Sequence, residues 1–254
     1  MLMHAAHPLV IAGADQTGMY ERDPWKRLQR TLALQYALTF GTRTEARAAA
    51  DRINAIHARI NGVDRVTGRP YDAMDPDLLL WVHACLVESA LLFERLTVGR
   101  LDERGRQRFH EEQMVAAELL RLPRDLIPAT VPELEAYIAA IVRSNELVVT
   151  DAARSVAGLF LDPPREAQWR PVLRSVARLA FGTLPSELRP GYGLPRRRES
   201  AVTRATLVGL RAVRPLLPAK LRFIQPYQRW RRRQRGLDDP SEVALARRSL
   251  GIRR

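Results

Sequence analysis

Seven residues of this sequence could carry chemistry: an arginine and a threonine near the N-terminus, and the five histidines. Arg27 and Thr31 lie four residues apart, so on a helix they share one face. Together they could bind a haem propionate, another carboxylate or bound oxygen, or they could brace a helix bundle. The standard catalytic signatures are missing, including a phosphate-binding loop, a nucleophile elbow and a two-histidine zinc motif. The histidines are His4, His7, His57, His83 and His110.

The surroundings of the histidines divide them into two groups. His57 and His83 lie in apolar stretches, where an imidazole on a rigid helix suits a haem iron. A histidine in such a place is more often a hydrogen-bonded core residue, so both interpretations stay open. His110 lies in a charged stretch and is predicted to be solvent-exposed and without function. His4 and His7 could belong to a zinc site, but no cluster of further ligands supports one.

Helical periodicity dominates the elements that must position these residues. Strand-like alternation is nearly absent, so the predicted fold class is all-α. Gly62–Pro76 is predicted to be a loop, and Gly191 begins the expected internal connection. The periodicity and capping residues predict helices over Pro24–Phe40, Thr44–Ile60, Leu78–Leu96, Asp102–Leu120, Val131–Glu146, Asp151–Leu161, Gln168–Phe181 and Ser200–Leu217.

Length and composition are those of a globular protein with a sizeable core. The chain has 254 residues, of which 46% are hydrophobic and 27% are charged, which excludes a disordered chain. We expect one helical domain over residues 1–236 and a polar, poorly ordered tail over residues 237–254. No stretch of about 18 uninterrupted apolar residues appears, so no membrane span is expected.

The net charge of +13 comes from one part of the sequence. Fourteen Arg or Lys residues and one acidic residue, Glu199, lie between Arg189 and Arg235, and the rest of the chain is neutral. A solvated basic arm is the first interpretation of this segment. A patch for a membrane surface or a polyanion is the second, with nucleic acid the less favoured partner. The single cysteine, Cys85, and an N-terminus without a secretory signal lead us to expect a cytoplasmic location.

Eight short segments, taken in order, favour one family. The sequence resembles the oxygenase MpaB/rubber oxygenase catalytic-domain family, which includes the latex clearing proteins, from about His7 to Gly236. The densest similarity lies between Asp23 and Val87. The segments are His7-Pro-Leu-Val, Asp23-Pro-Trp-Lys-Arg-Leu-Gln-Arg-Thr31, Phe40-Gly-Thr, His57-Ala-Arg-Ile-Asn-Gly62, Gly68-Arg-Pro-Tyr-Asp-Ala-Met-Asp-Pro76, Leu79-Leu-Trp-Val-His-Ala-Cys-Leu-Val87, Leu184-Pro-Ser-Glu-Leu-Arg-Pro-Gly-Tyr-Gly193 and Arg214-Pro-Leu-Leu-Pro-Ala-Lys-Leu-Arg222.

The resemblance implies a globin-like helical bundle around haem b, which is held without covalent attachment. It implies a haem-dependent oxygenase that uses dioxygen on an apolar, isoprenoid or other olefinic substrate. By the same resemblance His57 is the iron ligand, and Arg27 and Thr31 line the haem pocket. His83 is a second haem-site candidate: a hydrogen-bond partner, a rival iron ligand or a core histidine.

Two departures from the family pattern bear on these expectations. Latex clearing proteins carry a lysine just before the threonine, on the distal side of the iron, and this chain has Arg30, which stays protonated. Family members usually carry a helix before the His7 segment, whereas this chain begins six residues before it. A haem-binding protein without oxygenase turnover and a helical interaction module with a basic C-terminal arm remain the alternatives.

Overall fold

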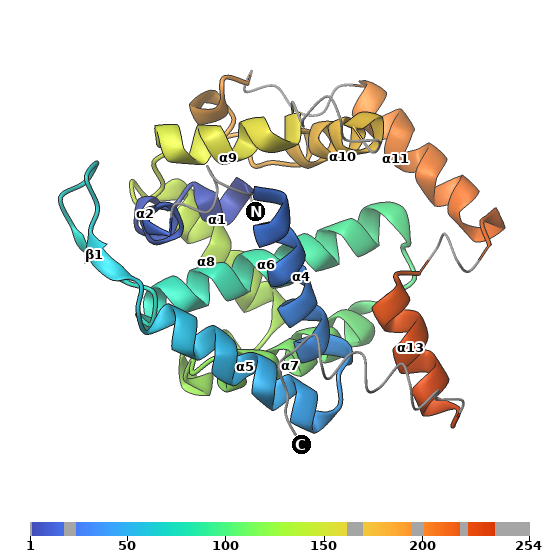
Figure 1. The fold of residues 1–254 in the computed structure, drawn as a ribbon. Helices are drawn as coiled ribbons and strands as arrows, with labels where there is room; N and C mark the ends of the chain where they lie inside the picture. The colour runs from blue at the N-terminus through green and yellow to red at the C-terminus, as the bar shows by residue number, and fades with distance from the viewer. Residues whose placement is uncertain (1, 18–23, 162–169, 195–200, 219–222, 237–254) are drawn as a thin grey trace.

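The computed structural model describes residues 2–17, 24–161, 170–194, 201–218 and 223–236 (Figure 1). Helices make up most of this part of the chain, which confirms the predicted all-α class. A globin-like arrangement and a haem pocket remain predictions. The α-helices are α1 (Leu2–Ala5), α2 (Pro8–Gln16), α4 (Pro24–Phe40), α5 (Arg43–His57), α6 (Pro76–Thr97), α7 (Glu103–Leu119), α8 (Val131–Arg143), α9 (Asp151–Leu161), α10 (Arg170–Gly182), α11 (Ala201–Val213) and α13 (Gln225–Gln234).

Each of the eight predicted helices has a counterpart, from α4 to α11. The predicted starts at Gln168 and Ser200 lie outside the described residues, as does the tail over residues 237–254. The capping residues explain the agreement. Thr42 accepts a hydrogen bond from the backbone N–H of Glu45, whose side chain accepts one from the backbone N–H of Thr42, so α5 begins with a capping box. Asp75 caps the start of α6, because its side chain accepts a hydrogen bond from the backbone N–H of Asp77.

Helix α6 is the centre of the fold. It contacts α1, α2, α7, α8 and α11, and Figure 1 shows it running through the middle of the molecule. Trp81, Val87 and Leu91 are almost completely buried and belong to one cluster with Leu134 and Ile138 of α8. Burial of this apolar surface is the main favourable term in folding, so the core lies around α6.

Helix α6 is also the one helix, within the described residues, that is long and apolar enough to cross a membrane. Its most apolar window has a mean hydropathy of 1.5, and 44% of that window is buried inside the protein. The central helix of a soluble protein satisfies the same criterion. The packing of α6 against helices on several sides favours the role of a core helix.

Two groups of helices lie on either side of α6. In Figure 1, α9, α10 and α11 run along the top of the molecule, and α5 and α7 lie below α6. Helix α4 crosses between these groups and meets α5 at Gly41, whose N–H donates to the carbonyl of Ala37. From this junction α4 and α5 diverge in Figure 1.

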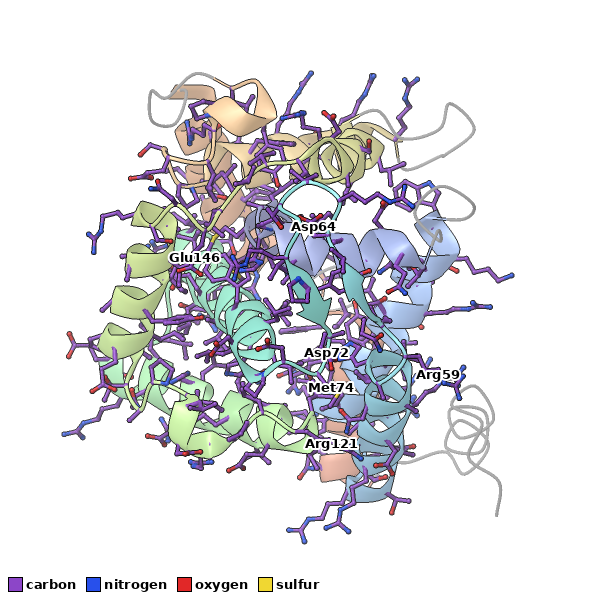
Figure 2. All side chains as sticks on the ribbon, turned by 90° about the vertical axis from the view of Figure 1, so that its left-hand side faces the viewer. Arg59, Asp64, Asp72, Met74, Arg121 and Glu146 are labelled. Carbon is purple, nitrogen blue, oxygen red and sulfur yellow. The ribbon has the colours of Figure 1, made fainter. Side chains whose placement is uncertain are left out.

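The segment predicted to be a loop, Gly62–Pro76, contains most of a short β-hairpin, so that prediction was wrong in part. Strands β1 (Asn61–Val63) and β2 (Pro70–Asp72) pair antiparallel, with Gly62 opposite Tyr71. Figure 2 looks onto the hairpin, with Asp64 near its turn and Asp72 nearer its base. Three-residue strands are too short to show an alternating pattern, which explains why the sequence did not predict them.

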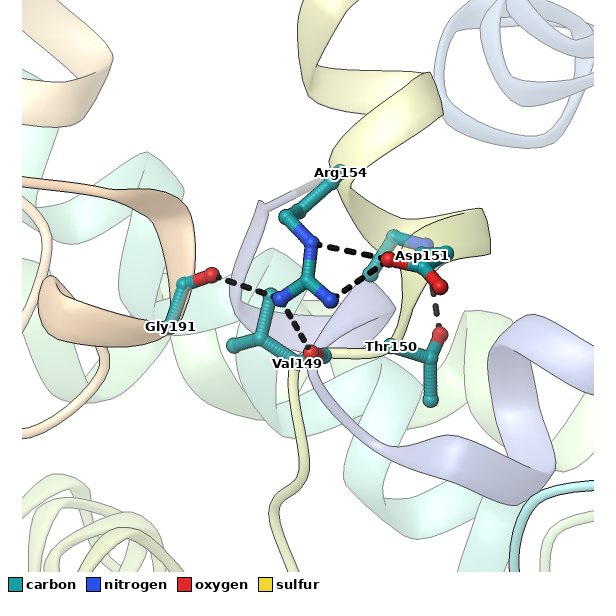
Figure 3. A network of polar contacts seen from close by, with 6 residues as sticks. Val149, Thr150, Asp151, Arg154 and Gly191 are labelled. Carbon is teal, nitrogen blue, oxygen red and sulfur yellow. Dashed lines mark hydrogen bonds and ion pairs between the residues drawn. The ribbon is translucent and has the colours of Figure 1, made fainter.

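The predicted connection at Gly191 joins the C-terminal half of the chain to the N-terminal helices. The 3-10 turn η2 (Pro190–Tyr192) lies there, and the hydroxyl of Tyr192 donates to the carbonyl of Leu2 over 2.8 Å. Figure 3 shows Arg154 of α9 donating to Asp151 and to the carbonyls of Val149 and Gly191. A side chain at position 191 would meet Val149 at 2.6 Å, so this close approach requires glycine.

Candidate functional site

His57 is the last residue of α5, and the chain turns immediately after it. Its carbonyl accepts a hydrogen bond from the N–H of Ile60 over 2.9 Å. Burial lowers the pKa of its imidazole, which favours the neutral form. Its Nδ1 atom is buried without a hydrogen-bond partner. A neutral imidazole with an unpartnered buried nitrogen is the form in which histidine binds a metal.

Arg27 connects α4 to the C-terminal end of α2. Its Nη1 donates to the carbonyl of Ala14 and to Oγ1 of Thr17, each over 2.9 Å. Thr17 Oγ1 in turn donates to the same carbonyl over 2.8 Å. The last carbonyls of a helix have no partner within it and carry partial negative charge, so a guanidinium stabilises that helix end. Arg27 therefore holds α4 against α2.

The end of α2 also contacts the turn that follows His57. The position of Gly13 lies against Ile60 and Tyr71, and Gln16 Nε2 donates to the carbonyl of Asn61. Since Arg27 binds the same helix end, the structure brings Arg27 and the turn after His57 onto α2. The sequence did not indicate this role of α2, because its prediction of helices began at Pro24.

Thr31 lies in a different environment from Arg27, although both belong to α4. Thr31 is exposed, and so are Gln29, Arg30, Leu32 and Ala33, whereas Arg27 is half-buried. Five consecutive residues of an α-helix cover more than one full turn. Protein therefore covers α4 only in part at this turn, and Leu32 is 37% exposed. Arg27 and Thr31 were predicted to share one helix face, and of these two residues Arg27 is packed against protein and Thr31 is exposed.

His83 lies near the middle of α6, at the edge of an exposed apolar face. Leu86 and Phe93 of this face are 44% and 64% exposed. Burial, and then the nearby His110, lower the pKa of His83 to about 4, so its ring is neutral at pH 7. Its Nε2 atom is buried without a hydrogen-bond partner. Both candidate imidazoles are therefore neutral and have an unpartnered buried nitrogen.

The prediction that His110 is solvent-exposed was wrong. The residue is completely buried in α7, and its Nε2 lies 2.7 Å from the carbonyl of Pro128. A carbonyl only accepts hydrogen bonds, so Nε2 is the donor in this contact. The many charges around His110 in sequence lie on the other faces of α7, which explains the error.

The two N-terminal histidines are part of the core. His7 immediately precedes α2, and its ring centroid lies 6.4 Å from that of Trp81. Burial lowers the pKa of both His4 and His7, most strongly for His4. Within the described part of the chain, no group of three or more His, Cys, Asp or Glu side chains is placed to hold a metal ion.

Comparisons with known proteins place these elements in a family. The model of the family described as "ER-bound oxygenase mpaB/B'/Rubber oxygenase, catalytic domain" matches residues 1–218. Two curated relatives, the uncharacterized proteins Mb2261 of Mycobacterium bovis and Rv2237 of Mycobacterium tuberculosis, are each 24% identical over 184 residues. The matched region covers 72% of this chain and 64% of each relative, so the chain spans less than two thirds of their length.

No solved structure matches the chain. The family match includes α4, α5 and α6, the helices that carry Arg27, Thr31, His57 and His83. On this match over most of its length, the chain belongs to the oxygenase MpaB/rubber oxygenase catalytic-domain family.

Proposed function

We propose that this protein is a haem b-dependent oxygenase that uses dioxygen on an apolar substrate, such as an isoprenoid or another olefin. Membership of the oxygenase family carries this proposal, because the matched residues 1–218 include every candidate site residue. Membership of the family supports oxygenase activity. The activity, the haem and the substrate class all require direct tests.

The histidines of the site fit a haem. Iron binds the neutral form of imidazole, and burial keeps both His57 and His83 in that form. Each also has one buried ring nitrogen without a hydrogen-bond partner. His57 is the proposed iron ligand, because it occupies the position that the family resemblance indicates. His83 is the rival ligand on the same grounds of protonation and burial.

Apolar side chains on α4 and α6 fit the flat face of a porphyrin or an apolar substrate. Leu32 is 37% exposed, and Leu86 and Phe93 are 44% and 64% exposed. Covering apolar surface is favourable by about 25 cal/mol per Å². These side chains are the proposed apolar walls of the site.

When bound, a haem iron supplies the binding and activation of dioxygen, and the protein supplies position and surroundings. Arg27 acts in this proposal as a positioning residue, since it fixes α4 to the end of α2. Thr31 presents a hydroxyl beside Leu32 and is the proposed polar contact for haem or bound substrate. Arg30, adjacent to it, is exposed and stays protonated, so it does not ligate iron.

The test is an absorption spectrum of the full chain expressed with a haem supply and then titrated with haemin. We expect a Soret band, and a pyridine haemochrome spectrum of b type. A protein without a Soret band at any haemin concentration overturns the haem proposal. A haem-loaded protein is then incubated with oxygen and an isoprenoid olefin, with an oxygen-free sample as control. Carbonyl products in the first sample alone support oxygenase function, and their absence favours a haem protein without this turnover.

A further inference from the structure

A group of exposed aliphatic side chains lies in the C-terminal part of the described chain, where the proposed oxygenase chemistry gives them no role. Val213 ends α11, Leu216 belongs to the 3-10 turn η3 (Arg214–Leu216), and Ile224 precedes α13. Leu216 is 82% exposed, and Val213 and Ile224 are about half exposed. Large apolar side chains that remain this exposed and lie close together mark a site of contact with a partner or a membrane.

Positive charge surrounds these aliphatic side chains. Residues 201–236 contain ten Arg or Lys residues and no Asp or Glu. Arg211, Arg232 and Arg235 are exposed, and the nearest acidic residues in sequence, Asp238 and Asp239, follow Arg235. The segment therefore combines exposed apolar surface with an excess of positive charge.

Aromatic rings connect η3 to α13, so these residues form one surface. The guanidinium of Arg214, in η3, lies 5.9 Å from the ring centroid of Phe223, and that of Arg231, in α13, lies 6.0 Å from the same ring. Phe223 and Tyr227 lie 5.0 Å apart between ring centroids, and Tyr227 stacks on Trp230 at 5.6 Å. We call the surface made by Val213, Leu216, Ile224, Arg232 and Arg235 the C-terminal face.

We propose that the C-terminal face binds the surface of a bilayer that contains anionic phospholipids. Leu216 and its aliphatic neighbours would enter the interface with the acyl chains, and the exposed arginines would bind lipid phosphates. Arginine and aromatic side chains beside exposed aliphatic ones are the composition of interfacial protein segments. A nucleic acid accounts for the arginines but leaves the exposure of Leu216 unexplained, so the bilayer is the favoured partner. This proposal does not depend on haem or on oxygenase turnover.

The test is sedimentation of the full chain with two kinds of vesicle. One kind contains phosphatidylcholine alone, and the other contains phosphatidylcholine with phosphatidylglycerol. We expect strong binding only to the second kind, and we expect added salt to weaken it because phosphate contacts are screened. Equal binding to both kinds, or binding to neither, overturns the proposal.

Three variants separate this surface from a general effect of charge. Leu216→Asp and the pair Arg232→Glu with Arg235→Glu should each weaken binding by roughly tenfold or more. The pair Arg52→Glu with Arg59→Glu makes the same change of charge at exposed positions of α5 and the turn after it, and should leave binding near that of the wild type. Arg59, labelled in Figure 2, lies in the turn between α5 and β1.

Circular dichroism melts confirm that each variant folds, and Leu216→Ser replaces Leu216→Asp if the latter does not. Equal loss in the control pair shows a non-specific charge effect and overturns the proposal. If Leu216→Asp binds vesicles like the wild type while duplex DNA displaces them, the face is a nucleic-acid surface instead.

Discussion

Arg233 of α13 donates a hydrogen bond from Nη1 to Oε2 of Glu45 at the start of α5, over 3.1 Å and 188 positions of sequence. Arg233 also donates from Nη2 to the carbonyl of Phe40, the last residue of α4. The same carboxylate oxygen of Glu45 accepts the N–H of Thr42 over 2.7 Å. One buried carboxylate thus serves both the capping box of α5 and the attachment of α13. This part of the basic segment is a docked helix, which corrects its interpretation as a solvated arm.

Replacement of Arg233 by methionine should destabilise the protein. The change removes a charged hydrogen bond and leaves the carboxylate of Glu45, which is only 4% exposed, without its cation. We expect a loss of about 2 kcal/mol in the free energy of unfolding. Urea denaturation measures this loss, with Arg232→Met as the control because Arg232 is exposed. Equal effects of the two substitutions would show that the Glu45 contact contributes nothing specific.

The pH dependence of stability should reflect Glu45. Burial alone would raise its pKa, but the hydrogen bonds from Thr42 and Arg233 outweigh burial and hold the pKa below its usual value. A carboxyl whose folded pKa is depressed stabilises the protein above its unfolded pKa of 4.5, and this contribution is lost as the pH falls toward the folded pKa. Glu45→Gln should therefore flatten the acid side of the stability curve, as measured by urea denaturation at pH 3 to 7. An unchanged acid slope in this variant contradicts the assignment.

His83 predicts a separate loss of stability in weak acid. Its folded pKa of about 4 lies below the ordinary value of 6.5, so the unfolded chain binds a proton more readily than the folded protein. Above pH 6.5, His83 does not lower the free energy of unfolding. Its protonation lowers this free energy as the pH drops from 6.5 toward 4, and below pH 4 it causes little further change. The full contribution is about 3 kcal/mol. His83→Leu should remove this part of the slope between pH 6.5 and 4, and a wild-type slope in the variant would show that His83 is not the group responsible.

The helices that the sequence predicted share strong periodicity and clear start signals, such as Asp75 before α6 and Pro76 at its first position. Helix α2 has a histidine, His7, at its N-cap position and no side-chain cap, so Pro8 at its first position is the only start signal of the usual kind. Helix α13 consists mostly of Arg and Gln. Among the described residues, Arg233 attaches it to Glu45 and Phe40, and the ring of Tyr227 packs against Phe40. Tertiary contacts of this kind leave no periodic pattern in the sequence.

For the candidate site too, some residues could be selected from the sequence and some contacts could not. His57 and His83 could be selected from the sequence because apolar neighbours surround them, and the structure places both in positions where the neutral form is favoured. The contacts of Arg27 with the end of α2 could not be predicted, because no helix was predicted before Pro24. The structure places the carbonyl of Ala14 and the hydroxyl of Thr17 within hydrogen-bond distance of its Nη1. The contact of Arg27 with the end of α2 depends on how α2 packs against α4, which the sequence does not show.

Arg27 and Thr31 should respond differently to substitution. Arg27→Ala removes two hydrogen bonds that attach α4 to α2, and we expect it to lower the free energy of unfolding by about 1–3 kcal/mol. Thr31 is exposed, so Thr31→Ala should change stability by less than about 0.5 kcal/mol. Thermal melts followed by circular dichroism measure both effects. If Arg27→Ala melts like the wild type but binds haemin more weakly, Arg27 is a haem contact rather than a positioning residue.

The last prediction distinguishes the two candidate iron ligands. Both His57 and His83 are neutral and have an unpartnered buried nitrogen, so protonation does not separate them. The family resemblance favours His57, which lies at the end of α5. We expect His57→Ala to abolish or shift the Soret band of the haemin-loaded protein, with the far-ultraviolet circular dichroism of the wild type.

His83→Ala should retain the Soret band and lose only part of its haemin affinity. His110 is not a suitable silent control for this comparison, because it is completely buried and bonded to Pro128, so its substitution should lower stability. Glu112→Ala serves as the control, because Glu112 is an exposed residue of the same helix, α7. Gln107 is not used, because its side chain accepts a hydrogen bond from the first residue of α8. Added imidazole should restore a Soret band to the variant that lacks the true ligand, since a free imidazole can occupy the space of the removed ring. Restoration in His83→Ala and not in His57→Ala would assign the iron to α6.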